Sequence, residues 1–222
     1  MARKARISRK TKETDITVEL NLDGSGAHDV KTPIPFFSHM LSALAKHALF
    51  DLKLRAKGDV EVDLHHTVED AGICLGEAFK KALGDKTGIC RLGMASVPMM
   101  DSMSTVVLDI SGRPYFRFNS GKDGAAITKS IFPGRTLTPE GWVITGKDAA
   151  SVIKAVFDFG LVKEFMLAFA NNAGIDLHLT LNYGEDVHHA IESAFKALGR
   201  ALKDASRKDA RIKGVLSTKG KL

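Results

Sequence analysis

The chain has 222 residues, of which 44% are hydrophobic and 26% are charged, which is enough apolar material for one packed domain or two small halves. The formal net charge is +6, and the 2 cysteines have no CxxC spacing, so we expect reduced thiols in a cytoplasmic protein and no disulfide framework. No apolar run reaches the roughly 18 residues that a membrane span requires, and we expect neither a secretion signal nor a membrane partner.

Hydrophobic periodicity and turn residues predict the elements of both halves of the chain. In chain order, the first half is predicted to hold a strand over 16–22, a hairpin turn at 23–26, a helix over 36–49, a hairpin of strands 51–57 and 60–64, and a helix that begins at His65. The second half is predicted to hold strands over 96–109 and 115–119, an irregular insertion over 120–147, a helix over 151–171, a strand over 175–181, a turn at 183–185 and a helix that begins at His188.

Two segments of the chain are copies of one another, and each begins with a pair of histidines. When residues 65–82 are aligned without gaps on residues 188–205, 9 of 18 positions are identical, including both histidines and the glutamate that follows. Apolar residues recur three and four positions apart in both copies, which predicts two amphipathic helices. An internal repeat of this kind predicts two similar halves, of about 10–95 and about 96–205.

The repeated His-His-x-x-Glu motif has a spacing that suits metal binding. On a helix, His65 and Glu69 share a face, whereas His66 points about 100° away from His65. Adjacent histidines therefore hold one ion together only with difficulty, but they can hold two different ions. A single copy of the motif could be the polar face of an ordinary amphipathic helix, and two matching copies make that interpretation much weaker.

Two more histidines enlarge the set of candidate ligands. His39 lies in the helix predicted before the first copy, and His178 lies in the strand predicted before the second copy, on the face opposite Leu177 and Leu179. The set then has six imidazoles, two carboxylates and no thiolate, which provides four protein ligands for each of two ions and fits Mn²⁺ or Fe²⁺ better than structural Zn²⁺. The candidate ligands are His39, His65, His66, Glu69, His178, His188, His189 and Glu192.

Basic side chains at turns and near the C-terminus are candidates for binding a phosphate monoester. Guanidinium groups bind phosphate through paired hydrogen bonds, and a Ser/Lys loop adds a hydroxyl and an ammonium group, although each could equally be a surface charge. The candidates are Arg91, Arg113, Lys196, Ser217 and Lys219. Both ends of the chain are basic but are not interleaved with aromatic residues, so we expect a solvated terminus or a phosphate site, and no nucleic-acid binding.

Eight segments spread along the chain match the motifs of one known enzyme family. They are 9–14 with 22–26, 37–41, 58–70, 82–85, 108–114, 177–178, 188–197 and 217–220. On these residues the chain resembles the imidazoleglycerol-phosphate dehydratase family of histidine biosynthesis, and the duplicated His-His-x-x-Glu with the terminal Ser-Thr-Lys-Gly is the most specific part of the match. The sequence departs from the family's usual residues at Ser38, Ala43, Met100-Asp101 and Asp186.

The resemblance implies a fold and an assembly. The implied fold is α+β, with two duplicated halves like the second domain of ribosomal protein S5, each a small sheet packed on helices, in one compact unit with a C-terminal substrate-binding tail. The implied assembly is a large homo-oligomer built from trimers, in which subunits share the metal sites. The implied cofactor is Mn²⁺, two ions per protomer, bound by the eight ligands named above.

The resemblance also implies a reaction, the metal-dependent dehydration of D-erythro-imidazole glycerol phosphate to imidazole acetol phosphate. Metals can stabilise the ionised imidazole of the substrate at neutral pH, and this metal-bound imidazolate would expel the hydroxyl group. Glu13 is carried over as the acid–base and substrate-contacting residue, whereas Glu69 and Glu192 would serve catalysis through the metals. The phosphate contacts would come from Arg91, Arg113, Lys196, Ser217 and Lys219.

The residues leave three functions of other classes open. A dinuclear metallohydrolase acting on a phosphate ester would also need two ions, although such enzymes commonly use Asp ligands and both copies of the motif are poor in Asp. A nucleic-acid-binding module is permitted by the basic ends and by fold analogy alone. A shell-forming protein without catalysis is the third alternative.

Overall fold

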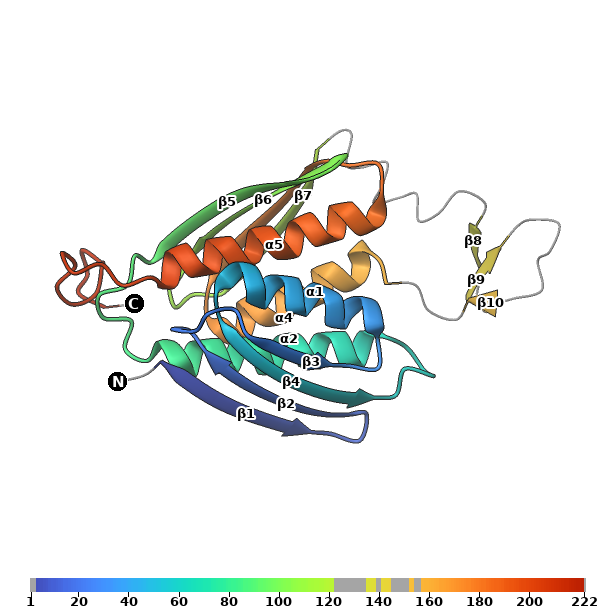
Figure 1. The fold of residues 1–222 in the computed structure, drawn as a ribbon, viewed down its shortest axis with the longest axis horizontal. Helices are drawn as coiled ribbons and strands as arrows, with labels where there is room; N and C mark the ends of the chain where they lie inside the picture. The colour runs from blue at the N-terminus through green and yellow to red at the C-terminus, as the bar shows by residue number, and fades with distance from the viewer. Residues whose placement is uncertain (1–2, 122–134, 139–140, 145–151, 154–156, 222) are drawn as a thin grey trace.

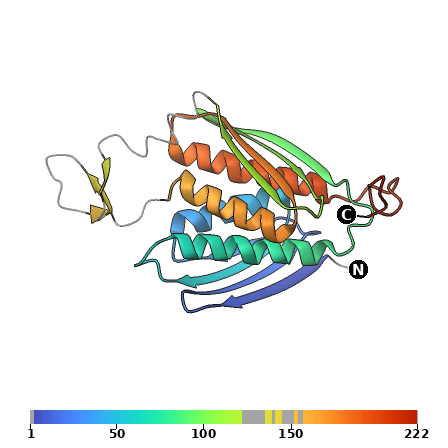
Figure 2. The same ribbon diagram turned by 180° about the vertical axis from the view of Figure 1, so that it is seen from behind.

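Two four-stranded sheets enclose the helices in this computed structural model, which describes residues 3–121, 135–138, 141–144, 152–153 and 157–221 (Figure 1). One sheet is built from strands of the first half of the chain, and the other from strands of the second half. The views of Figures 1 and 2 agree that the helices form a layer between the two sheets. The molecule is therefore a sandwich of sheet, helices and sheet.

The two halves repeat one order of elements. The first half consists of β1 (Lys4–Lys10), β2 (Thr14–Asn21), β3 (His28–Lys31), α1 (Pro35–Ala48), β4 (Asp51–Gly58) and α2 (His65–Leu83). The second half consists of β5 (Leu92–Met99), β6 (Ser102–Asp109), β7 (Tyr115–Ser120), α4 (Phe159–Ala173), β11 (Asp176–Tyr183) and α5 (Val187–Ser206). In each sheet the fourth strand pairs antiparallel with the second and parallel with the third. The predicted α+β fold of two similar halves is confirmed.

Helices join the two halves, and the repeated glycine of each copy allows it. A Cβ atom at Gly76 of α2 would lie 2.7 Å from the carbonyl oxygen of Phe169 on α4, and one at Gly199 of α5 would lie 2.5 Å from that of Leu44 on α1. Only glycine permits such close backbone approach. The rings of Phe165 and neighbouring phenylalanines are fully buried between these helices, so one apolar core spans both halves.

Two predicted hairpins of the first half are wrong. Residues 23–26 do not form a hairpin between β2 and β3, because β4 lies between these two strands in the sheet. The segment instead crosses to the far edge, where the Asp51 carboxylate accepts hydrogen bonds from the backbone N–H groups of Ser25 (2.8 Å) and Ala27 (3.1 Å). Residues 60–64 form turns that lead into α2, so β4 has no hairpin partner there.

Other predictions need changed boundaries. The basic residues at the start of the chain form the edge strand β1, because Ala5 and Ile7 face the core while the basic residues alternate with them. Residues 96–109 hold the end of β5 and all of β6, separated by a turn, and α4 begins at 159 rather than 151. The insertion predicted to be irregular contains the short strands β8 (Arg135–Thr138) and β9 (Gly141–Ile144), which pair with each other, and β9 also pairs with β10 (Val152–Ile153). Residues 122–134, 139–140 and 145–147 of the insertion lie outside the described ones.

The helices α1, α2, α4 and α5 all begin at the same end of the sandwich, on the right in Figure 1. We call this the helix-start end, and the opposite end, where both chain termini lie, the helix-stop end. The β1–β2 and β5–β6 turns are also at the helix-start end. Within the described part of the chain, no helix has the length and apolar character to cross a membrane.

Candidate metal and phosphate sites

Three of the predicted metal ligands meet at the helix-start end. His188 and Glu192 are one turn apart on α5, with 3.1 Å between His188 Nε2 and Glu192 Oε2, and His39 of α1 brings its Nε2 to 3.6 Å from the same oxygen. The three ligand atoms lie within 4.8 Å of one another, and no other group of three or more such side chains was found among the described residues. Two nitrogens and one carboxylate oxygen suit a divalent cation with hard or borderline preferences.

The carboxylate at the centre of this trio is held ionised. Burial of Glu192 acts to raise its pKa, but Lys196 and then the two histidines outweigh burial and lower the pKa below its usual value. Lys196 Nζ lies 2.7 Å from Glu192 Oε1 and 3.4 Å from Met99 Sδ. Lys196, which the sequence placed among the phosphate contacts, is therefore a partner of a candidate metal ligand in the single chain.

The first copy of the motif forms an equivalent but smaller cluster at the start of α2. His65 Nε2 lies 3.4 Å from Glu69 Oε2, and the described part of the chain supplies no third ligand to this pair. The neighbouring ring of His66 has its Nδ1 3.1 Å from an oxygen of Asp59, and this contact raises the pKa of His66, with a further contribution from the charge of Glu13. The backbone N–H of Asp59 also donates to the backbone oxygen of Glu13 (3.2 Å), so the turn that carries Glu13 lies beside the segment that leads into the first His pair.

A hydrogen-bond network around the buried Asp70 carboxylate, which the sequence did not reveal, fixes the turn that carries Glu13. The carboxylate of Asp70 is buried, accepts a hydrogen bond from Arg9 Nε (2.9 Å) and another from the hydroxyl of Thr14. The hydroxyl of Thr11 in turn accepts from the backbone N–H of Glu13 (3.1 Å). The β1–β2 turn is therefore tied to α2 one residue beyond Glu69, although no local pattern indicates the contact.

The predicted phosphate residues gather at the helix-stop end instead. A hollow of about 890 Å³ is lined there by Arg91, Arg113, Ser217 and Lys219, which are four of the five predicted phosphate contacts. The guanidinium of Arg91 pairs with both oxygens of Asp109 (2.6 and 2.8 Å) and donates to the backbone oxygen of Leu216 (2.8 Å), so it also holds the C-terminal tail against the sheet. The arrangement presents several cationic groups to an anion.

The metal trio and the phosphate hollow are far apart within one chain. The backbone N–H of Arg91 donates to the carbonyl of Ala205 (2.8 Å), near the end of α5, whereas His188 is at its start. Seventeen residues of helix separate these two positions, which corresponds to about 26 Å at 1.5 Å per residue. A substrate the size of a sugar phosphate cannot reach from one to the other.

His178 is not part of the metal trio and lies on the sheet that carries Asp109, the partner of Arg91. It is on the outer face of this sheet, paired with Val107, two residues along β6 from Asp109. His178 Nε2 lies 3.0 Å from Asp176 Oδ1, and Arg117 is its register partner on β7. Exposed apolar side chains lie on the same face; this outer patch consists of Leu92, Met94, Val107 and Tyr115, which are 42–66% exposed. Exposed apolar clusters of this kind are typical of protein contacts.

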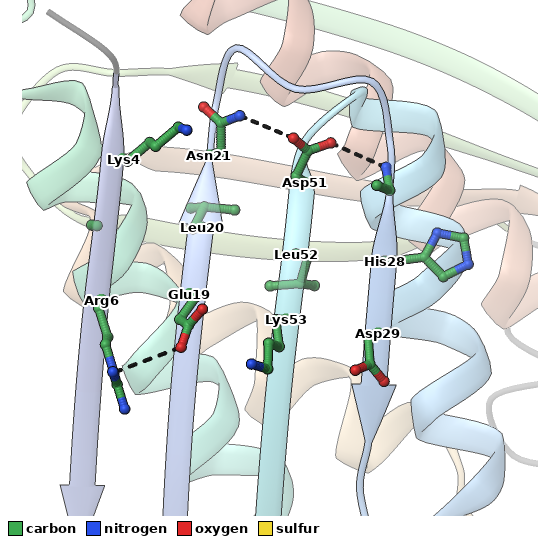
Figure 3. A pocket seen from close by; sticks show the side chains of 12 residues that line it. Lys4, Arg6, Glu19, Leu20, Asn21, His28, Asp29, Asp51, Leu52 and Lys53 are labelled. Atoms are coloured by element: carbon green, nitrogen blue, oxygen red, sulfur yellow. Dashed lines mark hydrogen bonds and ion pairs between the residues drawn. The ribbon is translucent and has the colours of Figure 1, made fainter.

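The outer face of the other sheet differs. A shallow hollow of about 640 Å³ lies over β1, β2, β4 and β3. Charged side chains of both signs line it (Figure 3), including Asp29, Lys53 and Arg6, whose Nε lies 3.8 Å from Glu19 Oε1. Of the residues predicted to bind metal or phosphate, none lines it.

Two of the positions that depart from the family's usual residues have clear local roles. The carboxylate of Asp186 caps α5 by accepting from the backbone N–H of His189 (3.0 Å), and Ser38 Oγ accepts from the backbone N–H of Thr32 (3.0 Å) before α1. Asp and Ser at such positions satisfy amide groups that would otherwise lack partners. Both substitutions therefore support the helices that carry His188 and His39.

Comparison with known proteins gives one consistent answer. The family model described as "Imidazoleglycerol-phosphate dehydratase" matches residues 32–131 and 142–202. The imidazoleglycerol-phosphate dehydratases of Acetivibrio thermocellus and Trichlorobacter lovleyi are 50% and 47% identical over 222 residues, covering 100% of both chains.

Solved structures agree with the sequence comparisons. The crystal structure of imidazoleglycerol-phosphate dehydratase from Staphylococcus aureus has a TM-score of 0.69 at 30% identity and covers 93% of this chain and 99% of that one. The crystal structure of IGPD from Pyrococcus furiosus in complex with (S)-C348 has a TM-score of 0.70 at 31% identity and covers 97% and 100%. The chain belongs to the imidazoleglycerol-phosphate dehydratase family.

Proposed function

We propose that this chain is a metal-dependent hydro-lyase that dehydrates D-erythro-imidazole glycerol phosphate to imidazole acetol phosphate in histidine biosynthesis. Membership of the family supports the reaction. The observation that carries the metal dependence is the trio of His39, His188 and Glu192, whose ligand atoms lie within 4.8 Å of one another. The cytoplasm, where histidine is made from soluble intermediates, is the proposed location.

The donor set of the eight predicted ligands fits Mn²⁺, and we propose two ions per protomer. It consists of imidazole nitrogens and carboxylate oxygens, and Glu192 keeps its negative charge although it is buried. His39, His188 and Glu192 would contribute to one ion, and His65 with Glu69 to another. Bound divalent cations supply positive charge that stabilises the ionised imidazole ring of the substrate and so assists loss of the hydroxyl group.

The chain's own residues then have distinct tasks. Glu13, held on the β1–β2 turn, transfers the proton: the C–H proton and the hydroxyl leave as water, and the enol product tautomerises to the ketone. Arg91, Arg113, Ser217 and Lys219 bind the phosphate, which anchors the substrate at a fixed distance from the reacting carbons.

We further propose that each active site is shared between subunits of a large homo-oligomer built from trimers. The metal trio and the phosphate hollow are about 26 Å apart along α5, so one chain cannot hold both ends of one substrate. His178 would be delivered to the metal ligands of a second copy, and the exposed outer patch around it supplies apolar area for that contact.

The test is dehydration of imidazole glycerol phosphate by the purified protein, with added Mn²⁺ and after removal of metal by a chelator. We expect activity that disappears with the chelator and returns with Mn²⁺. Inorganic phosphate is measured in the same reaction, because its release without imidazole acetol phosphate would identify a phosphate-ester hydrolase instead. Activity unaffected by exhaustive chelation would refute the metal dependence.

A further inference from the structure

The second histidine of each pair has a carboxylate beside its Nδ1 ring nitrogen. His66 Nδ1 lies 3.1 Å from Asp59 Oδ2, and His189 Nδ1 lies 3.1 Å from Asp101 Oδ1. A carboxylate can only accept, so Nδ1 must carry the proton in both rings, which leaves the Nε2 lone pair free for an ion.

These two carboxylates are not related by the sequence repeat. Asp59 is seven residues before His66 in the segment between β4 and α2, whereas Asp101 is 88 residues from His189, in the β5–β6 turn. The position that corresponds to Asp59 in the second copy is Asn182, whose side-chain oxygen accepts instead from Thr105 Oγ1 (2.8 Å). The two halves have thus reached the same ring contact from different places in the fold.

Both residues are held in place, Asp101 through its carboxylate and Asp59 through its backbone. Ser102 Oγ donates to Asp101 Oδ1 (2.8 Å), and the backbone N–H of Asp59 donates to the backbone oxygen of Glu13 (3.2 Å). Both carboxylates are mostly shielded, with side chains 21% and 32% exposed for Asp59 and Asp101. A fixed acceptor restricts both the tautomer and the ring angle of its histidine.

We propose that Asp59 and Asp101 are positioning residues that fix His66 and His189 with Nδ1 protonated and Nε2 directed at a divalent cation. This inference rests on the proposed function, because it assigns the task of two residues outside the ligand set of that site. Carboxylate partners of metal-binding histidines raise the basicity of the ring, and their loss typically weakens metal binding about 10- to 100-fold.

The experiment compares Asp59→Asn and Asp101→Asn with the wild-type chain by equilibrium dialysis against Mn²⁺. Asn keeps nearly the same shape but loses the charge, so the Kd for Mn²⁺ should rise about 10- to 100-fold. Glu61→Gln and Glu185→Gln are matched controls, because both glutamates are exposed and precede the same histidine pairs. They should bind Mn²⁺ with wild-type affinity, and Asp101→Glu should recover most of the loss in Asp101→Asn. Activity should return toward wild type when Mn²⁺ is raised above the new Kd.

The outcomes separate this inference from the function on which it rests. Wild-type Mn²⁺ affinity in both Asp→Asn variants would overturn the positioning role and leave the proposed function standing. Equal weakening in the two glutamate controls would also overturn it, because a general loss of negative charge would then be the cause. A wild-type protein that binds no Mn²⁺ would overturn the proposed function and this inference together.

Discussion

Mixing two inactive variants should restore activity if the active site is shared between chains. Arg113→Ala removes a cation from the phosphate hollow, and Glu13→Gln removes the group that we propose transfers the proton at the helix-start end. Alone, Arg113→Ala should lower kcat/KM about ten- to over a hundredfold, since a charge-assisted contact contributes roughly 1.5–3 kcal/mol. Glu13→Gln should lower kcat by about 10²–10⁴ while metal content is kept.

The size of the recovery follows from the separation of the two ends. The hollow that Arg113 lines is at the helix-stop end, and the β1–β2 turn that carries Glu13 is at the helix-start end. Each site would therefore take the two residues from different chains. In randomly mixed 1:1 oligomers, each contributing chain is intact at the relevant end with a chance of one half. About one site in four, roughly 25% of wild-type activity, should therefore be complete.

The assay dissociates both variants with a chelator, mixes them, restores Mn²⁺ and measures dehydration, with native mass spectrometry to confirm that the oligomers are mixed. A mixture of Arg113→Ala with Lys219→Ala is the control, because both changes affect the phosphate hollow and no fully intact hollow can form. Mixed oligomers with no more activity than the separate variants would refute the reasoning from distance and place the whole site within one chain.

Three further predictions concern single changes. Glu69→Gln should lower the bound metal measured by elemental analysis, whereas Glu13→Gln should keep it, because a neutral amide oxygen is a poorer ligand than a carboxylate; the opposite pattern would reverse the two roles. Gly199→Ala should lower the free energy of unfolding by about 1–3 kcal/mol in chemical denaturation, since the added Cβ would lie 2.5 Å from a carbonyl oxygen of α1. An unchanged free energy of unfolding would mean that α1 and α5 can move apart at no cost to accommodate the methyl group. Hydrogen bonds, first from the backbone N–H of Ser25, lower the pKa of Asp51 below its usual value of 3.8. The ionised carboxylate therefore stabilises the fold fully above pH 3.8, and this stabilisation is lost as the pH falls through the lower pKa of the folded state. Asp51→Asn should therefore flatten the acid limb of the stability curve below pH ~4, and an unchanged limb would exclude this carboxylate as its origin.

Local periodicity determined most of the secondary structure from the sequence. Helices depend on residues three and four positions apart, so α1, α2 and α5 were predicted to within a few residues, and the His–Glu contacts of the two motifs follow from the same spacing. The start of α4 was misplaced because the preceding residues also contain apolar side chains. The edge strand β1 was missed because its many basic residues concealed the alternation of Ala5 and Ile7.

Tertiary structure alone decided how the chemical groups are distributed. Three features depend on packing between distant parts of the chain. They are the position of β3 beyond β4, the contact of Asp101 with His189, and the contact of Lys196, the partner of Glu192, with Met99. The sequence predicted which residues would bind metal and phosphate, but it contained no distance between them. That distance is set by the length of α5, which runs the full depth of the sandwich and puts the two groups of residues at its opposite ends.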